Sequence, residues 1–387
     1  MIPTQEHVIS DLRGRCREAV RVAIQVALDE ELDALVGAGA YERSPERVDM
    51  RNGSYARRVL TSHGEVALEV GRTRAGGAAT ETLGRYRRRT PEIDEMVSEA
   101  YVRGLSTRDM GPVAAALTGE SIGRSAVSRV TKRLEEQVEE LRRAPITEPM
   151  GYVYLDATFL DTRWARVVEN VSALVAYGVG LDGKRQLLGV LIGVTESEES
   201  WAELLRELIE RGLSGVRMVI ADAHAGLRSA ARKALPEAKL QRCTVHLMRN
   251  VLAKVTQRHR RRLARELVAV LHALNLQAAK KALASFVQRF EGQFPEATAC
   301  LVEGFEAGTQ YFAFPSAHWK RIRTTNGLER LHGEVKRRTR AIGAFPDRAS
   351  ALRLVTAVAL QVTSLWSDRR YLDMSLLDRH PQHREAA

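Results

Sequence analysis

The spacing of hydrophobic residues changes along the chain, and each change predicts a different kind of structure. Over residues 6–36 apolar positions recur every three or four residues, which predicts an amphipathic helix. Residues 51–74 alternate instead between apolar and polar positions on either side of the turn SHG, which predicts a β-hairpin. Residues 92–143 return to helical spacing, so the first part of the chain is expected to be mostly helical.

From residue 151 the pattern becomes that of a mixed α/β domain. Apolar runs at 151–160, 167–179 and 185–194 predict three consecutive strands, and the short turn at Gly183 makes them antiparallel neighbours. A helix, a buried strand that ends at Asp222, a second helix and a short strand follow. Three antiparallel strands followed by strands that alternate with helices is the order of the ribonuclease-H-like fold. The predicted fold class is therefore α/β, with a ribonuclease-H-like core.

Breaks in these patterns divide the chain into segments. A helical block follows the α/β strands and is interpreted as an insertion into the core. The predicted segments are an N-terminal helix and hairpin (1–90), a helix-turn-helix region (91–146), the first part of the core (150–245), the helical insertion (246–318) and the last part of the core with C-terminal helices (319–387).

A DNA-binding helix-turn-helix is one interpretation of residues 91–146. A short helix leads into a break at residues 118–120, and a second helix, capped by Ser125, is predicted to run without interruption to residue 143. In such a motif the first turns of the second helix enter the DNA groove. The side chains expected there are Arg124, Ser125, Ser128 and Arg129. Helical hairpins are also common in proteins that do not bind DNA, so the pattern leaves a purely structural hairpin open.

Composition narrows the class of protein. The chain carries 59 Lys and Arg against 48 Asp and Glu, a net charge of +11, which favours nucleic acid or an acidic surface as a partner. Its three cysteines are too few for a disulfide framework, which indicates a reducing compartment. No uncharged apolar run reaches the roughly 18 residues of a membrane helix, and the first residues lack a signal peptide's apolar stretch. We therefore expect a soluble intracellular protein.

Two aspartates lie in apolar stretches of the sequence, where burial of an ionised side chain costs free energy. Asp156 lies within the first α/β strand and Asp222 ends a later one, and an ionised carboxylate there needs a compensating cation. Mg²⁺ prefers carboxylate oxygens, and Glu329, near the start of a basic helix, would supply a third. The cations of that helix expected to meet DNA phosphates are Lys336, Arg337, Arg338 and Arg340. The structural alternatives are strand-end caps or salt bridges for the aspartates, and neutralisation of basic neighbours for Glu329.

The sequence CTVH places Cys243 and His246 at a C-x2-H spacing. Structural zinc sites normally need two such pairs, and the spacing of the other cysteines and histidines offers no second one. We expect these two residues to pack and to hydrogen-bond where the helical insertion leaves the core.

Several of these segments together resemble the Mutator-like bacterial insertion-sequence transposases. The motifs are DATFL, IADAHAGLRSA, CTVHLMRN and RTTNGLERLHGEVKRRTR, and the resemblance extends over most of the chain. It implies a DDE transposase with a ribonuclease-H-like core, in which Asp156, Asp222 and Glu329 form the catalytic, metal-binding triad and hold two Mg²⁺ or Mn²⁺ ions. It also implies a helical insertion that carries the Cys-x2-His motif. His332 stands where the family pattern has Asn.

The expected function is that of a transposase that binds the ends of its insertion element and performs metal-dependent DNA cleavage and strand transfer. Its expected partners are double-stranded DNA, at the element ends and the target, and further copies of the same chain in a homodimer or higher homo-oligomer. The expected location is the bacterial cytoplasm, at the nucleoid when DNA is bound, with no membrane partner. Two alternatives stay open: a ribonuclease-H-like nuclease without strand transfer, and a catalytically silent DNA-binding protein derived from a transposase.

Overall fold

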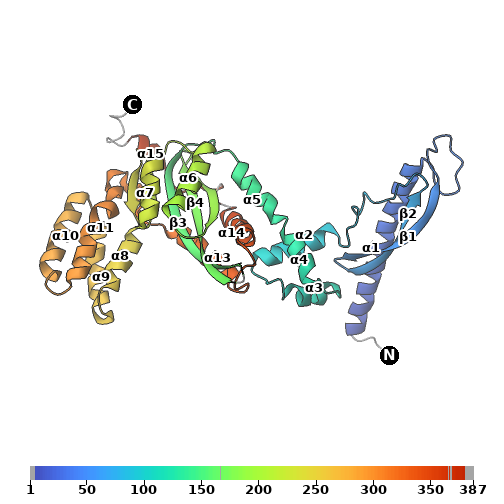
Figure 1. Cartoon of the computed structure of the whole chain (residues 1–387), viewed down its shortest axis with the longest axis horizontal. Coiled ribbons are helices and arrows are strands. Elements are labelled where there is room, and N and C mark those ends of the chain that lie inside the picture. Colours follow the sequence, from blue (N-terminus) through green and yellow to red (C-terminus); the bar gives the residue numbers. More distant parts are fainter. Residues whose placement is uncertain (1–4, 166, 365, 367, 380–387) are drawn as a thin grey trace. The chain divides into compact units, whose positions relative to one another are not determined.

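Two sheets organise the chain, a two-stranded sheet near its start and a five-stranded sheet in its second half (Figure 1). The computed structural model describes residues 5–165, 167–364, 366 and 368–379. The chain divides into two units, Met1–Arg133 and Leu134–Ala387, and each contains one of the sheets.

The first unit begins with a long helix on a hairpin. Helix α1 (Gln5–Val36) packs against strand β2 (Gly64–Thr73), which pairs antiparallel with β1 (Arg51–Thr61). Apolar side chains of the helix and of both strands, among them Leu28 and Leu68, share one small buried cluster. The predicted helix and hairpin are confirmed.

Helices α2 (Pro91–Val102), α3 (Met110–Thr118) and α4 (Arg124–Thr131) complete the first unit, and α2 packs against α4. The prediction of one uninterrupted helix to residue 143 is wrong, because α4 ends at Thr131 and a separate helix α5 (Leu134–Arg143) follows. The cap is also different, since α4 begins after Gly123 and Ser125 lies inside its first turn.

The physical reason for the break lies in what the two helices pack against. Arg133, two residues after the end of α4, forms an ion pair with the buried Asp94 of α2. Leu134 and Val138 are buried instead in the second unit, where α5 packs against α14 (Arg348–Thr363). Tertiary contacts in two different units therefore override the helical spacing at residues 132 and 133.

The five-stranded sheet of the second unit has the order β5-β4-β3-β6-β7. Strand β3 pairs antiparallel with β4, and β4 with β5, whereas β6 runs parallel to β3 and β7 parallel to β6. The strands are β3 (Met150–Trp164), β4 (Val167–Gly180), β5 (Arg185–Gly193), β6 (Met218–Ala221) and β7 (Lys239–Arg242). The three predicted antiparallel strands and the two later strands are confirmed.

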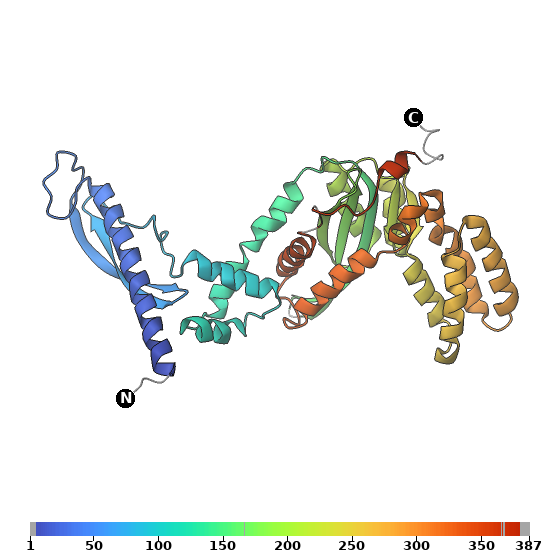
Figure 2. The same ribbon diagram turned by 180° about the vertical axis from the view of Figure 1, so that it is seen from behind.

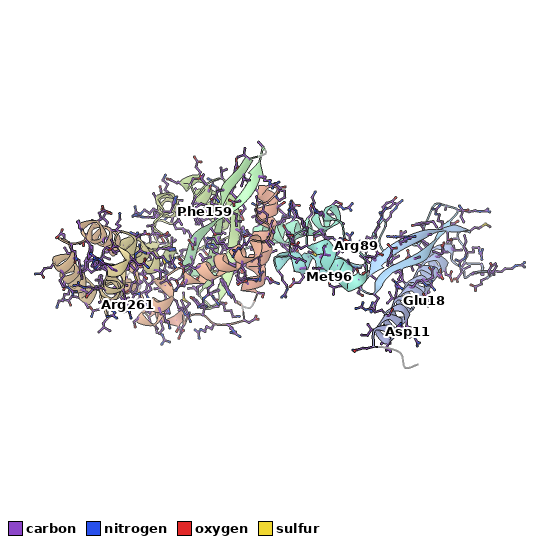
Figure 3. All side chains as sticks on the ribbon, turned by 90° about the horizontal axis from the view of Figure 1, so that it is seen from below. Asp11, Glu18, Arg89, Met96, Phe159 and Arg261 are labelled. Carbon is purple, nitrogen blue, oxygen red and sulfur yellow. The ribbon has the colours of Figure 1, made fainter. Side chains whose placement is uncertain are left out.

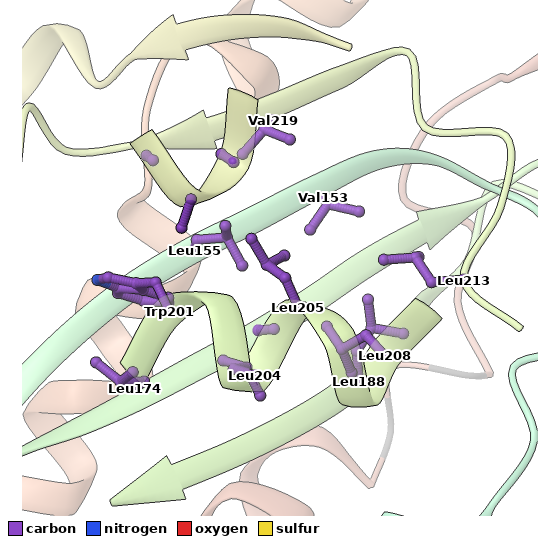
Figure 4. Packing of buried hydrophobic residues seen from close by; sticks show 14 of the residues in the cluster. Val153, Leu155, Leu174, Leu188, Trp201, Leu204, Leu205, Leu208, Leu213 and Val219 are labelled. Atoms are coloured by element: carbon purple, nitrogen blue, oxygen red, sulfur yellow. The ribbon is translucent and has the colours of Figure 1, made fainter. Parts of the chain in front are cut away.

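Side chains on β3 alternate between the two faces of this sheet. Val153 and Leu155 point to the face that carries α6 (Glu198–Glu210) and α7 (Ala225–Ala234). They pack there with Trp201 in the main hydrophobic core (Figure 4). Helices α6 and α7 thus cover one face of the sheet.

The other face carries Tyr152 and Tyr154, and the ring of Tyr154 stacks on that of Tyr177 with centroids 4.4 Å apart. Helices α13 (Asn326–Thr339) and α14, in orange and red in Figure 2, lie on this face. Asp156 of β3 lies on this face and can therefore approach Glu329 of α13.

Between β7 and α13 the chain is helical. Helices α8 to α11 enclose a separate apolar core with Phe286 and Phe290 at its centre. The elements are α8 (Thr244–Ala253), α9 (Gln257–Leu271), α10 (Leu276–Phe290), α11 (Pro295–Gly308), the 3-10 turns Gln310–Ala313 and Ser316–His318, and α12 (Trp319–Ile322). The chain's last described helix is α15 (Ser375–Asp378). None of the helices in the described ranges is both long enough and apolar enough to cross a membrane.

Candidate active site

Two aspartates lie at the same end of the five-stranded sheet. Strands β3 and β6 run in parallel with Tyr154 paired to Ile220, and Asp156 and Asp222 each follow two residues later. Asp156 stays within β3, opposite Val175 of β4, whereas Asp222 lies just beyond β6. Parallel strands in register bring equivalent positions side by side, so these carboxylates occupy one edge of the sheet.

The alternation of β3 turns Asp156 toward the face that carries α13. Helix α13 is fixed there by the buried side chains of Leu328, Leu331 and Val335, whose i, i+3, i+7 spacing places them on one face of the helix. Gly327 lets the helix approach closely, because a Cβ at this position would lie only 2.6 Å from the Tyr177 hydroxyl oxygen. The first turn of α13 is thereby held against the sheet.

Glu329, in that first turn, is joined to Asp222 through a histidine of α8. His246 Nε2 lies 3.5 Å from Glu329 Oε1, and His246 Nδ1 lies 3.9 Å from Asp222 Oδ1. Arg249, one turn further along α8, donates a hydrogen bond of 2.7 Å to the same Glu329 oxygen. The structure therefore brings the helix acid and one sheet acid to a shared partner.

Asp156 has a histidine neighbour of its own. His332 Nδ1, one turn after Glu329 on α13, lies 3.4 Å from Asp156 Oδ2. The side chain of Asp156 is only 13% exposed, against 26% for Glu329 and 37% for Asp222. Every one of the predicted acids is thus partly accessible and faces an imidazole.

Cys243 and His246 connect the helical insertion to α13. Cys243 precedes α8 and is fully buried, and its Sγ accepts a hydrogen bond of 3.4 Å from the backbone amide of Thr325. A side-chain hydrogen bond with Cys243, followed by the charges of Asp222 and Asp156, raises the pKa of His246 to about 9. His246 therefore carries a positive charge at neutral pH beside two of the acids.

A fourth carboxylate at this end of the sheet was missed by the sequence reasoning. Glu196, between β5 and α6, has Oε1 at 3.4 Å from Trp201 Nε1 and at 3.7 Å from His224 Nδ1. Burial raises the pKa of Glu196, and the negative charges of Asp156 and Asp222 raise it further. Its sequence signal was weak, because TESEES is equally typical of a solvated helix start.

The donor chemistry at this edge fits a hard divalent ion, since Asp156, Asp222 and Glu329 all offer carboxylate oxygens. Their arrangement is nevertheless not a closed metal site, because no three His, Cys, Asp or Glu groups within the described ranges are placed to hold an ion together. One Glu329 oxygen is occupied by Arg249 and one Asp156 oxygen faces His332. Binding an ion through all three acids requires these contacts to be exchanged.

Comparison with known proteins decides the family. Residues 4–368 match the family described as Transposase, Mutator family. The chain belongs to the Mutator family of transposases.

Relatives in this family are insertion-sequence transposases of similar length. The chain is 36% identical to the transposase for insertion sequence element ISRM5 of Rhizobium meliloti, over 94% of this chain and 92% of the relative. It is 35% identical to that of IS406 from Burkholderia multivorans, over 90% of each chain. It is 34% identical to that of IS256 in transposon Tn4001 from Staphylococcus aureus, over 89% of this chain and 90% of the relative.

The basic side chains expected to meet DNA in this Mutator-family chain differ in their accessibility. Lys336 and Arg337 of α13 and Arg340, directly after it, are exposed, and Arg337 forms an ion pair of 2.9 Å with Glu334. Arg338 is the exception and corrects the prediction. It is 9% exposed, and its guanidinium binds Gln361 of α14, so it packs two helices together instead of facing solvent.

The candidate recognition helix α4 exposes all four residues predicted to face DNA. They are Arg124, Ser125, Ser128 and Arg129. The opposite side of α4 is buried through Ala126, Val127 and Val130. This division leaves one polar, cationic face free, as a helix that enters a DNA groove requires.

Proposed function

We propose that this chain is an active DDE transposase that binds the ends of its insertion element, cleaves the DNA and transfers the strands. Asp156, Asp222 and Glu329 are the proposed catalytic and metal-binding residues. One observation carries the proposal. The acids of β3, β6 and α13 converge on one sheet edge, where His246 contacts both Asp222 and Glu329 and His332 contacts Asp156.

We infer that the catalytic core is ribonuclease-H-like. The order β5-β4-β3-β6-β7, with antiparallel pairing among the first three strands and parallel pairing for the last two, supports this assignment. Helices α8 to α11 of the helical insertion follow β7, and the first of them supplies His246 and Arg249 to the site. The insertion is thus proposed to help position Glu329.

The residues of the site have distinct proposed tasks. Asp156, Asp222 and Glu329 would hold the divalent ions, two Mg²⁺ or Mn²⁺. The chemistry supplied by two bound ions at such sites is activation of the attacking oxygen and stabilisation of the leaving oxygen. Arg249 and protonated His246 offset the repulsion between the acids before a cation arrives, since like charges at close range disfavour ionisation.

The proposed partner is double-stranded DNA, contacted by α4 and by the exposed cations Lys336, Arg337 and Arg340 of α13. We further propose that copies of the chain assemble on the element ends as a homodimer or larger homo-oligomer, and that the protein acts at the nucleoid in the bacterial cytoplasm. The excess of Lys and Arg supports a polyanionic partner.

The test is cleavage and joining of the element's own end DNA with Mg²⁺. Replacing Asp156, Asp222 or Glu329 by Ala should abolish both reactions and leave DNA binding intact, because carboxylates do not attract phosphate. Glu334→Ala is the matched control, since Glu334 lies on the same helix and pairs with Arg337. Cleavage that persists in one triad variant would remove that residue from the site. Cleavage without joining would favour a ribonuclease-H-like nuclease. DNA binding without either reaction would favour a catalytically silent DNA-binding protein derived from a transposase.

A further inference from the structure

A cavity of about 440 Å³ in the first unit is lined mainly by arginines. The basic run RYRRRT (85–90) supplies Arg87, Arg88 and Arg89, α4 supplies Arg129, and Arg133 follows two residues after the end of α4. Asp94 is the one carboxylate among the lining residues. The basic run and the candidate recognition helix are distant from each other along the chain. Together they line one strongly cationic pocket.

Asp94 holds two of these arginines in place. Its side chain is 7% exposed, and its oxygens lie 2.9 Å from Arg89 Nε and 3.1 Å from Arg133 Nη2. The acid thereby ties three segments together: the chain that follows the hairpin, where Figure 3 labels Arg89, the first turn of α2, and the end of α4. A buried carboxylate with two guanidinium partners is a rigid support.

The basic run is also fixed by its backbone. The Leu60 amide of β1 donates to the Arg88 carbonyl, and the Thr90 amide donates to the Leu60 carbonyl. Arg57 of β1 donates to the carbonyl oxygens of Gly84 and Arg87. The run therefore lies along the edge of the hairpin in a defined conformation, which lowers the entropy cost of gripping a ligand.

The remaining lining arginines are not neutralised by any acid in the part of the chain that the structure describes. Arg87, Arg88 and Arg129 are exposed, and within the described ranges none of their side chains forms an ion pair. Both oxygens of Asp94 are already engaged. Guanidinium groups gathered around a cavity repel one another until an anion enters, and they bind phosphate oxygens with paired hydrogen bonds.

We propose that this pocket binds a backbone phosphate of DNA and that Asp94 is its positioning residue. The ligand follows from the neighbours of the pocket, because Arg129 belongs to the exposed face of α4 that also presents Ser125 and Ser128. Phosphate contacts of this kind fix the register of a recognition helix, whereas base contacts provide specificity. The inference rests on the proposed function only in taking DNA as the ligand.

The test measures binding of the full chain to a short DNA duplex of random sequence at several NaCl concentrations. Arg88→Ala and Arg129→Ala should each lower the slope of log K against log salt by about one, since each removes one phosphate contact. Lys132→Ala is the matched control, because it removes an exposed cation next to Arg133 that does not line the pocket. Its slope should change less than that of either pocket variant.

Asp94→Asn tests the positioning role with almost no change in side-chain volume. It should weaken DNA binding while the exposed cations Arg88 and Arg129 are still present, because Arg89 and Arg133 lose their support. Far-ultraviolet circular dichroism checks the fold, and the arginine variants keep the test valid where Asp94→Asn fails to fold.

Three other results would contradict the proposal or its premise. Equal slopes for Lys132→Ala and Arg129→Ala would show diffuse charge and overturn the pocket. Thermal stabilisation of the wild type by inorganic phosphate, together with unchanged DNA slopes in the variants, would show a site for free anions and overturn DNA as the ligand. A wild-type chain that binds no DNA would contradict the proposed function itself, whereas DNA binding that ignores the pocket variants contradicts only this inference.

Discussion

The candidate active site and the arginine pocket differ in how their charged side chains are partnered. In the second unit, Glu329 has Arg249 and His246 as partners, and Asp156 has His332. In the first unit, five arginines share a pocket with one carboxylate. The acids of the second unit have side-chain partners that a bound cation would have to replace, whereas the excess positive charge of the pocket attracts a polyanion. We therefore propose that DNA affinity resides chiefly in the first unit and chemistry in the second.

Outside the three acids themselves, the largest effect is expected at Gly327, where α13 approaches the sheet closely. In Gly327→Ala the new methyl group would meet the Tyr177 hydroxyl at 2.6 Å, and Tyr177 cannot retreat because it is fully buried and stacked on Tyr154. We expect a loss of about 1–3 kcal/mol in the free energy of unfolding. Cleavage should fall by about 10²-fold as Glu329 is displaced. Chemical denaturation and a cleavage assay measure the two effects.

The same helix provides the control. A methyl group added at Gly333 would meet open space, with no neighbouring side chain within 4 Å, so Gly333→Ala should be neutral or stabilise the helix by up to about 1 kcal/mol. DNA affinity should stay unchanged in both variants, because the arginine pocket is untouched. Equal behaviour of the two glycine variants would show that the close approach of α13 to the sheet does not matter.

A smaller effect is expected from the Cys243–His246 pair. Cys243 is the main cause of the raised pKa of His246, so Cys243→Ser should lower that pKa from about 9 toward its ordinary value of 6.5. A histidine with a raised pKa stabilises the fold fully below pH 6.5, and this contribution disappears as the pH rises through about 9. The variant should therefore be less stable than the wild type at pH 6.5 and below, and this difference in the free energy of unfolding should disappear as the pH rises through about 9. An NMR titration of the histidine resonances measures the shift.

His272 is an internal reference in the same titration. Burial in the helical insertion lowers its pKa to about 4, and Cys243→Ser should leave that value unchanged. The metal content of the purified protein should also be the same in the wild type and the variant. Stoichiometric zinc that is lost in Cys243→Ser would contradict the structural role of the pair.

The smallest effect concerns the exposed cations of α13. Lys336→Ala and Arg340→Ala should each lower the salt slope of DNA binding by about one at most, and substitution by Glu should cost more because repulsion is added. Arg338→Ala is the contrasting variant, since this buried arginine binds Gln361 and should change stability in place of the slope. A larger loss of affinity from α13 than from the pocket would reverse the comparison between the units.

Sequence spacing was a good guide where local rules govern. Alternation and turn residues predicted the hairpin and the three antiparallel strands, and the helical spacing of Leu328, Leu331 and Val335 agrees with their burial on one face of α13. The acids Asp156 and Asp222 could be singled out because a charge within a buried strand is exceptional.

The rest depends on contacts between distant segments. The helix breaks after Thr131, where Arg133 forms an ion pair with Asp94. Arg338 is buried because it binds Gln361 of α14. Both partners are distant in sequence. Glu196 and Arg249 escaped notice because exposed-looking acids and bases are common at helix starts and on helix surfaces. Their importance appears only when the fold places them beside the other site residues.

The most direct test of the division of labour measures DNA binding and single-turnover cleavage in Asp222→Asn and Arg129→Ala. Asp222→Asn should bind DNA at least as tightly as the wild type and fail to cleave it at any DNA concentration. Arg129→Ala should bind more weakly, with a lower salt slope, and its cleavage should recover as the DNA concentration rises. Cleavage by Asp222→Asn, or a cleavage defect in Arg129→Ala that saturating DNA does not relieve, would contradict the assignment of chemistry and affinity to separate units.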